Sequence, residues 1–437
     1  MTKHSIPYTS RISECAFIAY FFILSFFPFG ADIIKLLCLL TVISCWITIT
    51  ILEKKPFFTK TALNIPIFLF LFYSLLASFH SKNIKDSLHT LLFDYLIYFI
   101  IFFCMVNTIR GQEQIKRIIK SMLITSGLVC AYGLYGYYTG IAIHAERLVA
   151  TFEYHSRVAK YISLFLPIAV CLFFYYRDLL TRLYLILLIC VYSFSLILTM
   201  NRTSWVAIII TLFFICFAIQ KKYLLFIPVV VCIALICILP SKFITHAKTI
   251  TQIDQFFSSE KIIGERLQCW KASIAMIKDH PILGIGPGSK VFRYAYQQYG
   301  QEIKEKERLL KKETTSQEKK NKKGKKKAKV KTVDRLSHAH NIFLHVGVGT
   351  GIIGLLIFMW LFANVFYNAV KSWRTLSNGY EKMLLMGIVA SLISIFLHGF
   401  TDSFWKKPDA LFLWYIIGIL FVIIKSNEET PIPKTSW

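Results

Sequence analysis

Long apolar runs separated by short polar segments dominate the chain of 437 residues. An α-helix needs roughly 20 residues to cross the hydrocarbon core of a bilayer, and twelve runs reach or approach that length. No small-residue cleavage pattern follows the first run, so a cleavable signal peptide is not expected. The predicted membrane spans are 15–29, 33–52, 63–79, 88–106, 122–138, 161–176, 183–200, 205–219, 224–239, 342–366, 383–400 and 410–424.

The composition agrees with this pattern. Apolar residues make up 56% of the chain, aromatic residues 16% and charged residues only 17%, whereas soluble domains are about a quarter charged. These values exclude a secreted enzyme, a disordered chain and a conventional Rossmann or barrel enzyme. We expect an all-α polytopic membrane protein of about 12 transmembrane helices, with one large, partly helical periplasmic loop between helices 9 and 10.

The spans divide the chain into three parts. Residues 1–240 carry transmembrane helices 1–9, residues 241–340 form the periplasmic loop, and residues 341–437 carry helices 10–12 and a cytoplasmic tail. Within the loop, apolar residues at helical spacing predict an amphipathic helix over 265–278, which a glycine-rich turn at 284–288 ends. A second helix is expected to begin near Val291.

The net charge of +26 is concentrated in two places. Between Glu302 and Arg335, fifteen Lys or Arg stand against six Asp or Glu, which predicts a solvated Lys-rich insertion (302–335). Most of the remaining excess lies in short loops. With both termini in the cytoplasm, the inside short loops hold fourteen basic residues and the outside short loops seven, as the positive-inside rule requires. Membrane lipids are therefore the expected partners, and nucleic acid is not.

The cysteines give no sign of a disulfide or zinc framework. Of the eleven, all except Cys269 lie in or beside apolar runs, and no CxxC pair occurs. We expect neither a structural disulfide nor a zinc site.

Several ionisable residues lie where predicted spans meet the outer surface. Such groups are costly near the membrane, so they tend to be functional or paired. Arg202 stands out because almost no loop separates its two flanking spans. An interfacial arginine can also simply reach toward headgroups, so that reading stays open. The residues are Arg147, Arg157, Arg202, Arg266, His338 and His340.

These residue types suit one kind of chemistry. A guanidinium fork matches the oxygens of a pyrophosphate, and a histidine that titrates near neutrality can take a proton from an attacking hydroxyl. Together they favour group transfer from a lipid diphosphate to an alcohol, without ATP or another cofactor. A metal is not expected at the His338-Ala339-His340 pair, because no carboxylate lies nearby in the sequence. The glycine-rich turn lacks the Gly-Lys-Ser/Thr ending of a phosphate loop.

Three segments also resemble a known family. Residues 264–270 and 277–288 are similar to the Arg…Trp…Asp-x-Pro-x-x-Gly-x-Gly signature of the O-antigen ligase and polymerase superfamily. Residues 338–341, followed by glycines at 347, 351 and 354, resemble its second signature, and residues 201–204 its Arg motif. The span order fits as well, so the resemblance covers nearly the whole chain. The Lys-rich insertion is not part of the family pattern.

The resemblance implies a metal-independent, inverting glycosyltransferase of the bacterial inner membrane with a periplasmic active site. Its donor would be an undecaprenyl-diphosphate-linked glycan, and its acceptor a sugar hydroxyl of lipid A–core. By this resemblance His340 is the base, and Arg202, Arg266 and Arg147 hold the diphosphate. The supporting residues would be His338, Asn341 and Arg157.

Other functions remain open at this point. An O-antigen polymerase would use another lipid-linked glycan as acceptor, and a protein O-oligosaccharyltransferase would use a Ser or Thr side chain. A small-anion transporter is a remote alternative. It needs ionisable or helix-breaking residues near mid-membrane, whereas most of the polar residues named above lie at the outer surface. Asp94, Pro167 and Pro228 are the notable candidates for that role.

Overall fold

The computed structural model describes residues 5–54, 56–219, 262–318, 336–377 and 379–429. These residues are mostly helical, and the sheet found among them is a short antiparallel hairpin of β1 (Ile143–His144) and β2 (Arg147–Leu148). The helices, in chain order, are α1 (Ser5–Phe26), α2 (Asp32–Glu53), α3 (Asn64–His80), α4 (Ile84–Thr90), the π-helix η1 (Leu91–Tyr95), α5 (Leu96–Thr108), α6 (Gly111–Thr139), α7 (His155–Tyr175), α8 (Leu179–Leu198), α9 (Arg202–Ala218), α13 (Ile262–Asp279), α14 (Ser289–Glu318), α15 (Ile342–Thr375), α16 (Tyr380–Gly399) and α17 (Asp409–Glu429).

The described helices confirm the predicted class, an all-α polytopic membrane protein. Nine helices in the described ranges are long and apolar enough to cross a bilayer, while α3 and α9 are apolar but shorter. Each predicted span coincides with one or more helices except 224–239, which lies outside the described residues. The fourth predicted span is a composite, in which α4, η1 and α5 continue one another from Ile84 to Thr108.

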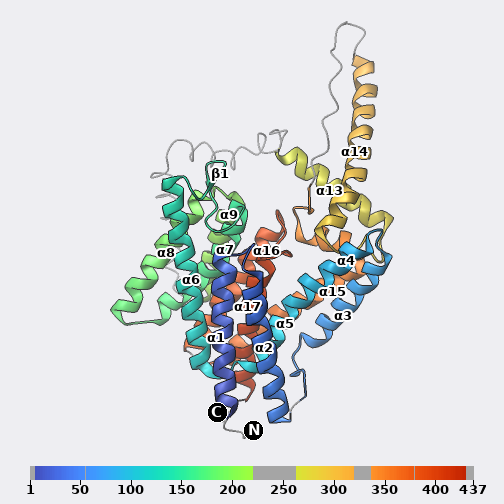
Figure 1. Cartoon of the computed structure of the whole chain (residues 1–437). Helices are drawn as coiled ribbons and strands as arrows, with labels where there is room; N and C mark the ends of the chain where they lie inside the picture. Colours follow the sequence, from blue (N-terminus) through green and yellow to red (C-terminus); the bar gives the residue numbers. More distant parts are fainter. Residues whose placement is uncertain (1–4, 55, 220–261, 319–335, 378, 430–437) are drawn as a thin grey trace, which may run out of the picture.

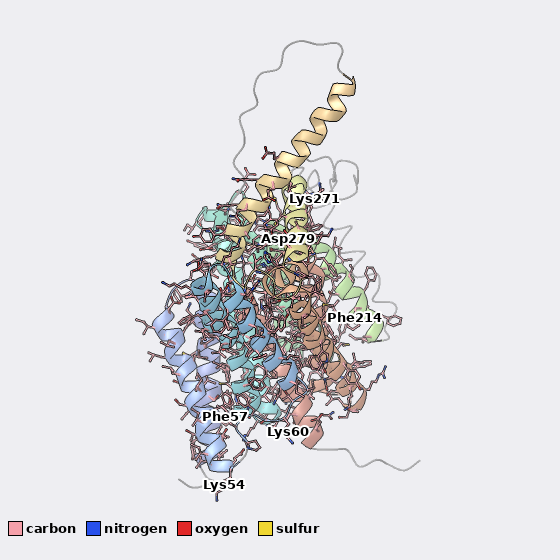
Figure 2. All side chains as sticks on the ribbon, turned by 90° about the vertical axis from the view of Figure 1, so that its right-hand side faces the viewer. Lys54, Phe57, Lys60, Phe214, Lys271 and Asp279 are labelled. Atoms are coloured by element: carbon pink, nitrogen blue, oxygen red, sulfur yellow. The ribbon has the colours of Figure 1, made fainter. Side chains whose placement is uncertain are left out.

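The helices form a bundle whose most buried members are α7, α16 and α17. Helix α7 packs along α16, and α17 packs along α5. Helix α1 begins and α17 ends at the same end of the bundle, whereas α13 and α14 lie beyond the opposite end (Figure 1), which we call the site end. Figure 2 shows the same division, with Lys54 and Lys60 at the first end and Lys271 and Asp279 at the site end.

Two helices stand where the sequence predicts helices in the long loop. Helix α13 covers the amphipathic stretch predicted at 265–278, and α14 begins close to Val291. Helix α14 continues to Glu318, so it includes the first part of the segment predicted to be a solvated Lys-rich insertion. Its many Glu, Lys and Arg residues agree with this helix, because they are good helix formers. Residues 319–335 lie outside the described residues.

Two helices at the site end have an asparagine as their N-cap residue. Asn201 Oδ1 accepts a hydrogen bond from Ser204 N (3.1 Å) before α9, and Asn341 Oδ1 accepts one from Leu344 N (3.1 Å) before α15. Each bond satisfies one of the backbone N–H groups that a helix leaves unpaired in its first turn. The caps therefore fix where α9 and α15 begin, and with them the positions of Arg202 and His340.

Two glycine-containing segments that are distant in the sequence interlock at the site end. The turn between α13 and α14 pairs with α15: Ile285 N donates to Val348 O (2.9 Å), and Gly286 N donates to Gly349 O (3.1 Å). Helix α15 is interrupted opposite this turn at Gly351, where φ is 69° and ψ is −174°, and Ile352 N donates to Pro281 O (2.7 Å). A Cβ at Gly351 would lie 2.1 Å from Ile282 O, so only glycine fits.

We expect the Gly351→Ala substitution to separate α13 from α15. The backbone conformation at Gly351 is one that essentially only glycine adopts, and the added Cβ would also clash with backbone. The free energy of unfolding should fall by about 2 kcal/mol or more, measured by thermal unfolding in detergent. Gly30→Ala is the matched control, because a Cβ at Gly30 meets nothing within 4 Å. Equal stability of the two variants would contradict the interlock.

Candidate functional site

A cavity of about 380 Å³ opens at the site end, where five segments of the chain meet. It lies between the beginnings of α7 and α9, the N-terminal part of α13, the segment that precedes α15, and the connection between α16 and α17. Four cationic side chains and two carboxylates line it: Arg157, Lys160, Arg266, Lys406, Asp402 and Asp409. The cavity therefore has an excess of positive charge suited to an anionic ligand.

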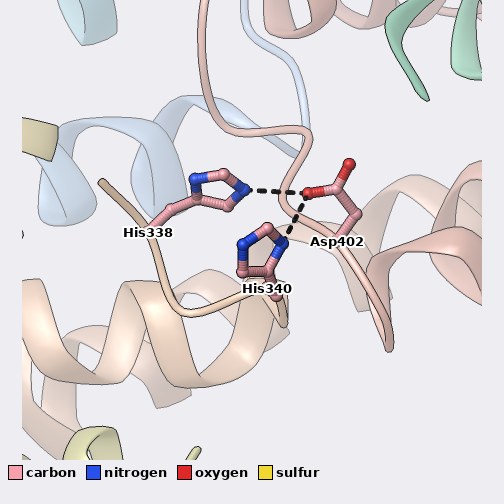
Figure 3. A group of neighbouring side chains, drawn as sticks. All are labelled: His338, His340 and Asp402. Atoms are coloured by element: carbon pink, nitrogen blue, oxygen red, sulfur yellow. Dashed lines mark hydrogen bonds and ion pairs between the residues drawn. The ribbon is translucent and has the colours of Figure 1, made fainter. Parts of the chain in front are cut away.

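Asp402, in the α16–α17 connection, is the centre of the site. Its Oδ1 lies 3.0 Å from His338 Nε2 and 3.7 Å from His340 Nδ1 (Figure 3). Its Oδ2 lies 3.3 Å from Lys160 Nζ, and the same ammonium also contacts Asp409 and donates to Ser403 O (2.9 Å). Lys160 is only 4% exposed, so this carboxylate is held by a cation that water hardly reaches.

The two histidines reach Asp402 from the same side of a short segment before α15. Ala339 between them is fully buried in a cluster with Cys269 and Met276 of α13. Burying the middle residue turns both neighbours the other way, and the His338 and His340 ring centroids lie 4.1 Å apart. His340 has a φ of 48°, a left-handed conformation that few non-glycine residues adopt. Such an unusual conformation is typical of a functional site.

Hydrogen bonds define the protonation state of His338. Lys406 Nζ lies 3.1 Å from His338 Nδ1, and whenever Lys406 is protonated it can only donate, so Nδ1 then accepts. The proton of the neutral ring is then on Nε2, which donates to Asp402. Burial, with a contribution from Lys406, lowers the pKa of His338 to about 4. His338 therefore stays neutral with both ring nitrogens occupied, whereas the contact of His340 with Asp402 engages only Nδ1.

The charges around Asp402 favour its ionised form. Burial acts to raise the pKa of this carboxyl, but Lys160 and the two histidines lower it well below its usual range. For Lys406, burial and not the attraction of a carboxylate determines the direction of the pKa shift. Burial, together with Lys160 and Arg157, outweighs the attraction of Asp402 and lowers the pKa of Lys406 to about 7. A fixed anion thus lies beside a lysine that titrates near neutrality.

The structure brings some of the sequence-predicted arginines into the cavity and leaves others at its margin. Arg266 and Arg157 line the cavity, and the Arg157 guanidinium lies over the ring of Phe29 at 4.7 Å. Arg147 bonds His155 Nε2 (2.8 Å), which is itself a lining residue. Arg202 is not among the lining residues, although Asn201 and Thr203 on either side of it are.

Asn341 has a structural role in addition to its cap. Its Nδ2 donates to Phe400 O (3.2 Å), which links the beginning of α15 to the end of α16. It does not line the cavity. Asp94, considered above as a mid-membrane transport group, forms an ion pair with Lys407 of the α16–α17 connection (3.2 Å). Pro167 lies inside α7, and Pro228 lies outside the described residues.

Sequence analysis missed the residues that hold the histidines in place. The connection contributes Asp402, Lys406 and Asp409, while Lys160 comes from α7. His398 also lines the cavity, and within the described part of the chain both of its ring nitrogens lack a hydrogen-bond partner. The sequence does contain a sign of these residues, because residues 402–409 include two aspartates and two lysines between adjacent apolar runs. Opposite charges in so short a loop suggest pairing at membrane depth.

The expectation that His338 and His340 have no carboxylate partner is wrong, because the fold brings Asp402 to them. The ligand atoms of the three residues lie within 4.8 Å of one another, which is a possible metal-binding arrangement. Both imidazoles, however, face the same carboxylate oxygen, and Lys160 and Lys406 lie beside the group. The Lys160 ammonium, joined by Lys406 when it is protonated, opposes a divalent cation, so the geometry favours a carboxylate that orients histidines.

Comparison with known families finds a match over a segment that contributes part of the cavity lining. Residues 187–359 match the family model described as O-antigen ligase. Over this segment the chain is similar to the O-antigen ligase family. The superfamily resemblance inferred from sequence is thereby confirmed. The O-antigen ligase segment includes Arg202, Arg266, His338 and His340, whereas Asp402 lies beyond it. No curated protein matches the chain.

We expect the low pKa of Lys406 to make stability depend on pH. The unfolded chain holds this lysine's proton up to a pH of about 10.4, whereas the folded protein releases it near pH 7. Between these values the unfolded state binds more protons, so stability should rise with pH. Thermal unfolding in detergent at several pH values should show this rise, and Lys406→Met should remove its contribution. Lys407→Met, which changes a lysine outside the cavity, should show the same rise of stability with pH as the wild type. An unchanged slope in Lys406→Met would contradict the assignment.

Proposed function

We propose that this chain is a glycosyltransferase that joins undecaprenyl-diphosphate-linked O-antigen polysaccharide to a sugar hydroxyl of lipid A–core. The match of residues 187–359 to the O-antigen ligase family model supports a lipid-linked glycan as substrate. The observation that carries the proposal is the cationic cavity in which His340 lies against an Asp402 carboxylate fixed by Lys160. Such a cavity joins a base to the positive charge that a departing diphosphate requires.

His340 is the base in this proposal. Its Nδ1 faces Asp402, which leaves Nε2 to accept the proton of the acceptor hydroxyl. The 3.7 Å separation exceeds a hydrogen bond, and catalytic contacts of this kind often shorten when substrate binds. Ionised Asp402 would then stabilise the imidazolium, as the carboxylate of a catalytic triad does. His338 acts as a positioning residue, since Asp402 and Lys406 occupy its two nitrogens.

The transfer itself needs no metal or cofactor. The deprotonated acceptor oxygen forms a bond to the anomeric carbon from the face opposite the diphosphate, and the bond from that carbon to the diphosphate oxygen breaks. The electron pair leaves with the lipid diphosphate, and the anomeric configuration inverts. Arg266 and Arg157 line the cavity in which this charge develops, and Arg147 and Arg202 at the margin extend the diphosphate contact. Activity should survive treatment with a chelator.

The membrane orientation is part of the proposal. Lys54 and Lys60 lie at the end where α1 begins and α17 ends, opposite the cavity. Basic residues in short loops favour the cytoplasmic side. We therefore assign the termini to the cytoplasm of a bacterial cell, the chain to its inner membrane, and the cavity to the periplasmic face, where the lipid-linked donor would be presented.

We expect His340→Ala to abolish transfer because the acceptor loses its base. Turnover by purified protein, with lipid-linked donor and lipid A–core acceptor, should fall by at least about a hundredfold. His89→Ala, an exposed histidine outside the cavity, should keep wild-type turnover. If His340→Ala has near-normal activity and His338→Ala loses activity, the base is His338 instead. Activity that requires a second lipid-linked glycan as acceptor would indicate a polymerase instead.

We expect Arg266→Lys to lower kcat about tenfold even though the positive charge remains. A lysine cannot offer the paired donors of a guanidinium to two diphosphate oxygens, and the leaving charge develops in the transition state. Steady-state rates at varied donor concentration separate kcat from KM. Arg293→Lys, on an exposed part of α14, is the control and should leave both constants unchanged. Wild-type kcat in Arg266→Lys would exclude a bidentate contact.

A further inference from the structure

A second cavity lies at the other end of α13. It has a volume of about 490 Å³ and lies between the α13–α14 hairpin and the connection from α3 to α4. We call it the tyrosine cleft and define it by a subset of its lining side chains: Asn83, Asp279, His280, Tyr294, Gln298 and Tyr299. None of these residues belongs to the first cavity.

The walls of the tyrosine cleft are held in place by specific contacts. Tyr299 Oη donates to Asp279 Oδ2 (2.7 Å), which joins α14 to the end of α13. The turn between them is fixed by Tyr73, whose hydroxyl donates to Ile282 O (2.7 Å). Lys290 at the start of α14 forms an ion pair with Asp86 of α4 (3.2 Å). The cleft is therefore built before any ligand arrives.

The chemistry of the tyrosine cleft differs from that of the first cavity. The lining includes one ammonium, Lys82, and two carboxylates, Asp279 and Glu302, so it has no excess of positive charge. The amides of Asn83 and Gln298 supply both donors and acceptors. Tyr294 is 61% exposed and adds an uncovered aromatic ring. An anionic headgroup would lack cations here, whereas a neutral molecule rich in hydroxyls and C–H edges finds suitable partners.

The geometry of α13 relates the two cavities. Arg266 lines the first cavity and Asp279 lines the tyrosine cleft. At about 1.5 Å of rise per residue, these positions lie about 20 Å apart along one helix. A polysaccharide whose reactive end occupies the first cavity spans such a distance with several sugars.

We propose that the tyrosine cleft binds sugar residues of the donor polysaccharide at a distance from its diphosphate-linked end, with Tyr294 as the stacking platform. The proposal rests on the glycosyltransferase function proposed above and adds to it a preference for donors with long glycans. Long donor glycans reach the cleft and gain affinity, whereas donors with a short glycan bind only through the first cavity.

The length dependence of the donor KM tests this proposal. With lipid-linked donors that carry either one repeat unit or many, Tyr294→Ala should raise the KM for the long donor about tenfold. The KM for the short donor and both kcat values should stay unchanged. Tyr294→Phe keeps the ring and should behave as wild type. Tyr138→Ala, which changes another exposed tyrosine, on α6 outside the cleft, is the matched control. Equal effects on both donors, or none, would overturn the proposal.

A binding measurement keeps the test independent of turnover. Lipid-free oligosaccharide, released by mild acid from the same donor, is mixed with the full-length protein in detergent, and saturation-transfer NMR reports contact with protein rings. Wild type and Tyr138→Ala should transfer saturation to the sugar, and Tyr294→Ala should not. Absence of transfer in wild type, or displacement by glycerol phosphate, would overturn the proposal. Tyr294-dependent binding in a protein that transfers no glycan would refute the proposed function alone.

Discussion

The site depends on one buried ion pair, between Lys160 of α7 and Asp402 of the α16–α17 connection. Both side chains are almost inaccessible to water, so each charge needs a partner of opposite charge beside it. The pair ties the connection to the bundle and fixes one carboxylate oxygen. The other oxygen is then presented to His338 and His340. Because Lys160 also contacts Asp409 and the backbone of Ser403, the connection has few other ways to pack.

The close contact between the turn after α13 and the start of α15 is a second constraint, and it places α13 near that carboxylate. The turn after α13 and the interrupted start of α15 approach so closely that side chains are excluded at their contact. The same packing buries Ala339 and Cys269 together. As a result, Arg266 from α13 and the histidines before α15 share one cavity, although more than seventy residues separate Arg266 from His338 in the sequence. The glycines are thus structural elements of the site and not binding groups.

The two cavities divide the surface by charge. The first contains more cations than carboxylates and lies where the bundle ends, which suits a charged group carried by a lipid. The second has no such excess and lies at the far end of α13. A single helix therefore connects a cavity with an excess of positive charge to one without such an excess. In the function we propose, the charged and the sugar parts of one long substrate would be recognised separately.

The sequence by itself determined the membrane class, the helices seen in the described part, the two loop helices, and the arginines and histidines of interest. These features follow from local composition and periodicity, which act within one segment. Only the tertiary structure decided that Asp402 and Lys160 complete the site, that His338 is blocked while His340 is not, and that Arg202 lies at the margin. Those outcomes depend on contacts between segments far apart in the chain and on burial, which changes the cost of a charge. The charges of residues 402–409 suggest pairing, but no local pattern says which distant residues they meet.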